Sequence, residues 1–146
     1  MNKTIKKTIS VLLALITVFS VTTCIVTAEE APPSKSLYYN YVSTTAAVSS
    51  SGLLTINNNY RIKSGSGFSS AKISTYVERK VLGIFWSKVN NGQPNNTWVA
   101  TPAILDYSRT YTLQLNQTGT YRVTAEYTFY GSSGSETITK QSTVVY

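Results

Sequence analysis

Apolar and polar residues alternate over much of the chain, which is the pattern of β-strands with one buried face. The clearest alternation lies in residues 121–129. One face of this strand is predicted to carry Tyr121, Val123, Ala125, Tyr127 and Phe129, and the other face Arg122, Thr124, Glu126 and Thr128. We therefore expect a half-buried antiparallel strand in this part of the chain.

Similar runs, separated by turns rich in Gly, Ser and Asn, predict further strands. They are expected at residues 37–48 with a break near Thr44, at 54–62 with a bulge or short loop at 57–59, at 71–78, at 97–105 in irregular form, at 110–115 and at 136–146. No long helical periodicity follows residue 36. The pattern predicts an all-β, two-sheet antiparallel sandwich of about seven strands.

The segment that ends the strand at 110–115 has the spacing of a tyrosine corner. Leu115 is followed by three polar residues, then by Gly119 and Tyr121. Gly119 can take backbone angles closed to other residues where the chain crosses between sheets. The Tyr121 ring would fill the corner, and its hydroxyl would bond to nearby backbone. This motif favours an immunoglobulin-like sandwich.

Residues 1–28 have the layout of a secretory signal peptide. Lys3, Lys6 and Lys7 precede an uncharged, mainly apolar stretch that ends in the small residues of Val26-Thr27-Ala28. A retained membrane anchor is the alternative, but polar residues interrupt the run, and a spanning helix needs about 20 apolar residues. We expect a helical signal peptide at 1–28, a flexible segment at 29–36, an immunoglobulin-like domain at 37–146, and secretion.

Cys24 leaves one alternative open for the exported protein. It follows Val21-Thr22-Thr23 in a loose match to the site at which bacterial lipoproteins are cut and acylated, although Gly or Ala usually stands where Thr23 does. Lipid anchoring at Cys24 is therefore the alternative to free release. Cleavage after Ala28 would remove the only Cys of the sequence.

Composition argues against several kinds of chemistry. The sequence has no His, so Ser-His-Asp and Cys-His mechanisms lack their base. Glu126 and Glu136 could face each other across the last hairpin as a glycosidase pair, but such residues are more often solvated partners of Arg and Lys. Metal-ligand spacing and phosphate-binding motifs are missing. We predict a non-catalytic protein with no cofactor and no metal.

The charge of the exported part is moderately positive. Of 13 Lys and Arg, three lie in the signal peptide, so residues 29–146 have ten against six Asp and Glu, a net charge of +4. The cations form no run, so a solvated surface is the simple interpretation, and retention on an anionic bacterial envelope is the functional one. No nucleic-acid-binding motif is visible, and nucleic acid is not expected as a partner.

The sharpest candidate for a contact site is the apolar run between Arg79-Lys80 and Lys88. If Gly83 marks a hairpin turn, an exposed tip could dock in a protein groove or on an anionic membrane. The alternative is one buried strand with a bulge at Gly83, which is the commoner outcome for such a run. The candidate contact residues here are Val81, Leu82, Ile84, Phe85 and Trp86.

Aromatic residues suggest a second kind of contact. Trp86, Trp98 or exposed tyrosines could stack on sugar rings, although two Trp in a sandwich are more often core residues. Tyr76 and Tyr130, on predicted outward faces, could also serve protein recognition.

Taken together, the predicted signal peptide, the Tyr-, Thr- and Ser-rich strands and the motif at 119–123 give a family resemblance. The chain resembles the small secreted immunoglobulin-like proteins of Gram-positive bacteria. It departs from antibody-type domains at Val123, which stands where their second Cys would be. The expected function is non-catalytic contact with a protein partner or the cell envelope. An antibacterial or toxin-like protein that contacts membranes through the tip, and a carbohydrate-binding module, are the alternatives.

Overall fold

The computed structural model describes residues 36–146, and the regular structure of this part is almost entirely extended. The strands are β1 (Tyr39–Val48), β2 (Leu53–Ile62), β3 (Phe68–Val81), β4 (Phe85–Lys88), β5 (Trp98–Ala100), β6 (Asp106–Gln114), β7 (Thr120–Gly131) and β8 (Gly134–Val145). A short 3-10 turn, Pro94–Asn96, precedes β5. The predicted signal peptide helix, Cys24 and residues 29–35 of the expected flexible segment lie outside the described residues.

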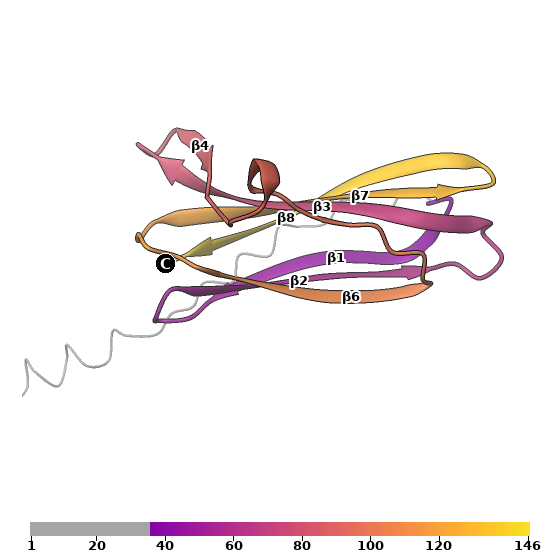
Figure 1. The fold of residues 1–146 in the computed structure, drawn as a ribbon, viewed down its shortest axis with the longest axis horizontal. Coiled ribbons are helices and arrows are strands. Elements are labelled where there is room, and N and C mark those ends of the chain that lie inside the picture. The colour runs from indigo at the N-terminus through magenta and orange to yellow at the C-terminus, as the bar shows by residue number, and fades with distance from the viewer. Residues whose placement is uncertain (1–35) are drawn as a thin grey trace, which may run out of the picture.

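The strands form two antiparallel sheets that face each other (Figure 1). One sheet has the order β1-β2-β6, and the other has the order β4-β3-β7-β8. β5 pairs with residues 73–75 of β3, on the edge that also pairs with β4. The predicted all-β fold with two antiparallel sheets is confirmed, with eight strands rather than about seven.

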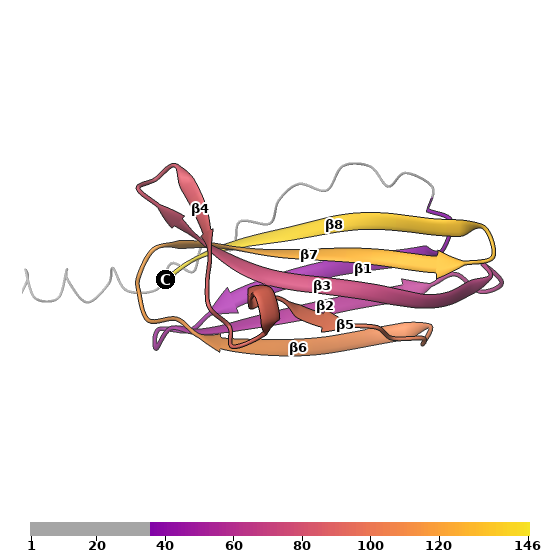
Figure 2. The ribbon, with the colours of Figure 1, turned by 45° about the horizontal axis from the view of Figure 1, so that its top comes forward.

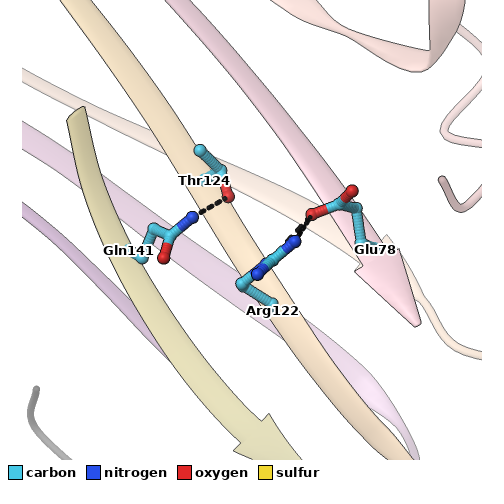
Figure 3. A network of polar contacts seen from close by, with 4 residues as sticks. All are labelled: Glu78, Arg122, Thr124 and Gln141. Carbon is cyan, nitrogen blue, oxygen red and sulfur yellow. Dashed lines mark hydrogen bonds and ion pairs between the residues drawn. The ribbon is translucent and has the colours of Figure 1, made fainter. Parts of the chain in front are cut away.

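The core lies between the sheets because the strands alternate as the sequence predicts. In β7 all five predicted inward residues, from Tyr121 to Phe129, are buried. Thr124, predicted to face outward, is buried as well. Gln141 of the neighbouring strand β8 donates its Nε2–H to Thr124 Oγ1 (3.2 Å; Figure 3).

Two apolar clusters fill the interior, one toward each end of the sandwich. In the first, Tyr60 stacks on Tyr107 with ring centroids 5.2 Å apart and meets Phe129 edge-on at 5.3 Å. The second is built around Leu115, Tyr121 and the short apolar residues of β2, β3 and β7. Aromatic rings thus supply most of the volume in the first cluster, and aliphatic side chains most of it in the second.

A buried polar layer separates the two clusters and joins the sheets. Thr44 Oγ1 donates to Asn58 Oδ1 (3.1 Å), and Asn58 Nδ2 donates across the interior to Thr75 Oγ1 (2.7 Å). The Tyr127 hydroxyl lies 2.8 Å from Thr44 Oγ1 and donates to the Ser43 carbonyl oxygen (2.7 Å). Each of the four side chains is buried, so each needs the partners that the others provide.

This layer explains where the predicted strand boundaries are wrong. β2 pairs residue by residue with β1 and β6 through 57–59, so there is no bulge or loop at these residues. The break expected near Thr44 is also absent, and the irregularity of β1 lies between Tyr39 and Tyr41. Asn58 and Thr44 have the composition of turns, but both point into the polar layer, where hydrogen bonds compensate for their burial.

The corner between β6 and β7 has the geometry that its sequence suggests. The Tyr121 hydroxyl donates to the carbonyl oxygen of Gln117. Gly119 has a φ of +143°, which L side chains rarely adopt, and it exchanges two backbone hydrogen bonds with Tyr146 (2.8 and 3.0 Å). Leu115 is buried in the second apolar cluster beside Tyr121. The corner therefore ties the start of β7 to the chain that follows β8.

Replacing Asn58 by Ala is expected to lower the free energy of unfolding by roughly 2–4 kcal/mol, because Thr44 and Thr75 lose a buried partner and a cavity remains. Asn59→Ala, one residue along on the outer face, is the matched control and is expected to change stability by no more than about 0.5 kcal/mol. Urea unfolding of both variants checks this. Equal losses in the two variants would contradict the role of the polar layer.

Buried tyrosines predict alkaline unfolding. Burial raises the pKa of Tyr60 and of Tyr107 to about 12, and it raises the pKa of Tyr121 and Tyr127 as well. The unfolded chain loses these protons near pH 10 while the folded chain keeps them, so ionisation favours unfolding.

With no His in the sequence, stability should be flat from roughly pH 6 to pH 9. Above about pH 10 it should fall by roughly 1.4 kcal/mol per pH unit for each buried tyrosine still protonated. Urea unfolding at a series of pH values measures this loss. In Tyr60→Phe, the slope of the free energy of unfolding against pH should decrease by the contribution of one proton. Unchanged stability up to about pH 12 would contradict the assignment.

Candidate functional site

Residues 79–88, here called the β3–β4 hairpin, project from one end of the five-stranded sheet (Figure 2). The Ile84 N–H donates to the Val81 carbonyl oxygen (3.1 Å) and closes a turn whose central residues are Leu82 and Gly83. Leu82 is 85% exposed, Ile84 71% and Phe85 63%. The apolar run is therefore an exposed tip, and the alternative of one buried strand with a bulge at Gly83 is wrong.

The turn holds Leu82 in a backbone conformation that suits other residues better. Leu82 has a φ of +52° and Gly83 a φ of +70°. Two-residue turns with positive φ at both positions favour Asn-Gly, and a left-handed conformation costs a residue such as Leu roughly 1 kcal/mol or more. Because the Leu82 side chain is almost fully exposed, intramolecular packing does not offset this cost. The fold gives no reason for a leucine at this position.

Trp86 joins the hairpin to the body of the sheet through cation–π contacts. The Arg122 guanidinium lies 4.3 Å from the centre of the Trp86 ring, and the Lys80 ammonium lies 5.9 Å from it. Arg122 Nε and Nη2 both donate to Glu78 Oε2, at 3.0 and 2.7 Å (Figure 3). This ion pair is mostly buried, so Arg122 is a fixed platform on which Trp86 rests.

Arg122 is a residue of this site whose role no local sequence pattern indicates. Its outward position on β7 was predicted, but its pairing opposite Glu78 depends on the register between β3 and β7. That register is a non-local property, and no nearby residue signals it.

The base of the hairpin is also joined to the corner. Arg79 Nη1 donates to the Gln117 side-chain oxygen, and the backbone oxygen of Gln117 accepts the Tyr121 hydroxyl. The corner therefore also holds Arg79, the last residue of β3 that pairs with β7.

The hairpin carries unbalanced positive charge. No acidic residue occurs from Arg79 to Leu105. Glu78 is engaged by Arg122, and no ion pair joins Lys80 or Lys88 to an acid within residues 36–146. Lys88 instead lies over the Tyr76 ring, with its ammonium 4.4 Å from the ring centre. The apolar tip is therefore bordered by exposed cations.

The structure does not bring Trp98 to the hairpin. The Trp98 ring stacks on Tyr111, with centroids 5.0 Å apart and an interplanar angle of 21°, and it packs against the second apolar cluster. Tyr76 lies beneath Lys88, and Tyr130 is near the opposite end of the molecule. The two Trp rings therefore do not form a common platform for a sugar.

The two carboxylates considered as a catalytic pair lie on opposite faces of their sheet. Glu126 is opposite Thr139, whereas Glu136 is opposite the inward residue Phe129. The Glu136 carboxylate accepts the Ser36 hydroxyl and the Leu37 N–H, both at 2.9 Å. Ser36, expected in the flexible segment, is thus buried and bonded. Glu126 and Glu136 therefore do not face each other across the hairpin, which is the arrangement that a catalytic pair would need.

Other parts of the described surface offer little for a ligand. A shallow hollow of about 290 Å³ lies at the far end of the three-stranded sheet, beside Tyr41 and the exposed Arg61–Asp106 ion pair (3.0 Å). Among residues 36–146, no three potential metal-ligating side chains cluster together. No helix in this range has the length and apolar character needed to cross a membrane.

Comparison with known proteins adds no assignment. No protein-family model matches the chain, and a search of curated proteins finds no match either. The fold and the site define the class only as a two-sheet all-β protein with an exposed apolar hairpin bordered by cations.

Leu82→Asn is expected to raise the free energy of unfolding by roughly 0.5–1 kcal/mol, because Asn tolerates positive φ and no packing is lost. Leu53→Asn serves as the control, since Leu53 is also exposed but has ordinary strand geometry, and it should not be stabilised. Thermal and urea unfolding of both variants measure the difference. A clear loss of stability in Leu82→Asn would mean that the leucine serves the fold.

Proposed function

We propose that the protein is a secreted, non-catalytic, immunoglobulin-like module that binds a partner protein or a cell-envelope component through the β3–β4 hairpin. The observation that carries the proposal is the tip itself. Leu82, Ile84 and Phe85 are the large apolar residues grouped there, and each is more than half exposed. Grouped apolar side chains without an intramolecular role are typical of a contact surface.

The strand order supports the immunoglobulin-like part of the proposal. If β1, β2, β3, β4, β6, β7 and β8 are lettered A, B, C, C′, E, F and G, the sheets are ABE and C′CFG. The hydroxyl of Tyr121, at the start of strand F, returns to the backbone of the preceding corner, as in that fold. β5 is an extra edge strand, and the interior has a polar layer in place of a disulfide.

The sequence supports the other parts. The predicted signal peptide at 1–28 favours export, and the absence of His together with the separated carboxylates favours contact over catalysis. A sugar-binding role is less well supported, since Trp98 stacks on Tyr111 and Trp86 rests on Arg122.

Binding to envelopes isolated from the producing cells tests this function. The triple variant Leu82→Ser, Ile84→Ser, Phe85→Ser is expected to lose most of the envelope binding of the exported protein while its melting temperature stays the same. The double variant Ile104→Ser, Leu105→Ser is the matched control, because it removes exposed apolar residues at the opposite end. It should bind as the unchanged protein does.

Sedimentation of envelopes with each variant measures the bound fraction. Equal binding by the triple variant and the unchanged protein would refute the hairpin as the contact site. Loss of binding in the control alone would place the contact at the far end of the sandwich.

A further inference from the structure

The chemical character of the side chains along the hairpin changes with their distance from the sandwich. Leu82 and Ile84 lie at or beside the turn, and the first pair of residues behind it is Val81 with Phe85. Lys80 and Trp86 form the next pair, Arg79 and Ser87 follow, and Glu78 with Lys88 lies nearest the body of the sheet. Moving inward from the tip, the character changes from purely apolar, to aromatic with a cation, to charged.

This order matches the layers of a membrane interface. Apolar side chains suit the region where acyl chains begin, Trp prefers the boundary with the headgroups, and Lys extends its ammonium toward the headgroups. Trp86 has cations on its ring but remains partly exposed, so it can lie at such a boundary. A groove on a partner protein could hold the apolar tip, but it would not explain why an aromatic residue with a cation, and then charged residues, follow the tip in this order.

The charge distribution indicates what kind of surface the hairpin would contact. Among side chains, the end of the molecule that carries the hairpin holds Arg79, Lys80, Lys88 and Arg122 against one carboxylate, that of Glu78. The acids Asp106 and Glu136 lie at or near the first residues of β6 and β8, at the opposite end of the sandwich. The neighbouring loops at the hairpin end, 49–52 and 115–119, carry no charge. The tip would therefore meet a negatively charged surface with little repulsion.

We infer that the β3–β4 hairpin docks on an anionic lipid bilayer. Leu82, Ile84 and Phe85 enter the boundary between headgroups and acyl chains, while Lys80 and Lys88 contact anionic headgroups. The inference rests on the proposed contact role of the hairpin and specifies its partner. Docking is reversible, because a few apolar side chains and two or three cations give a peripheral attachment rather than a span.

Co-sedimentation of the exported protein with vesicles tests the inference. Vesicles of equal parts phosphatidylcholine and phosphatidylglycerol should bind it about tenfold or more tightly than vesicles of phosphatidylcholine alone. Leu82→Asp should weaken binding to the anionic vesicles about tenfold or more, and Lys80→Gln with Lys88→Gln should remove most of the preference for anionic lipid. Leu105→Asp, at the opposite end, is the control and should bind almost unchanged.

The outcomes separate this inference from the proposed function. If the protein binds neither kind of vesicle while the hairpin triple variant still loses envelope binding, the partner is a protein or another envelope component. The inference that the hairpin docks on a bilayer is then wrong. Equal vesicle binding by Leu82→Asp and the unchanged protein would also overturn the inference. If hairpin variants bind envelopes normally, the proposed function itself fails.

Discussion

The hydrogen bond from Asn58 to Thr75 crosses the interior and joins the two sheets, and the rest of the arrangement depends on it. On the inward face of β2, Asn58 lies between the apolar residues Ile56 and Tyr60, so a shifted register would place its amide in an apolar layer without a partner. Thr44 and Tyr127 complete the layer from each sheet. A buried polar layer reduces the number of strand registers in which every buried polar group has a hydrogen-bond partner, as buried polar residues do in coiled coils. By selecting the register, the polar layer determines how far each strand extends at the two ends of the sandwich.

That alignment explains why the hairpin is exposed. The pairing of β3 with β7 ends at Arg79 opposite Tyr121, but β3 continues to Val81. Beyond Arg79 the strand pairs only with β4, and the hairpin bends away from the rest of the sandwich (Figure 2). Apolar side chains in this overhang have no core to enter. The corner and the Arg122 platform hold the overhang in place, so the tip is a fixed projection of the sandwich.

Much of the fold could be predicted from local sequence, because alternation and turn residues report on single strands. The inward face of β7 and the geometry of Gly119 are examples. The composition of Asn57-Asn58-Asn59 is typical of turns and predicts a bulge or short loop, whereas the burial of Asn58 depends on Thr44 and Thr75 from other strands. The apolar run of the candidate site and its flanking cations are visible in the sequence. Its exposure, however, depends on where β7 begins relative to β3, which local sequence does not encode.

In the function proposed here, the overhanging hairpin makes the contact and the sandwich supports it. Amide hydrogen exchange of the exported protein, free and bound to envelopes, tests this claim most directly. Binding should slow exchange in residues 79–88 and leave the other strands as they are in the free protein. Slower exchange along β8 or on the three-stranded sheet, with the hairpin unchanged, would contradict it.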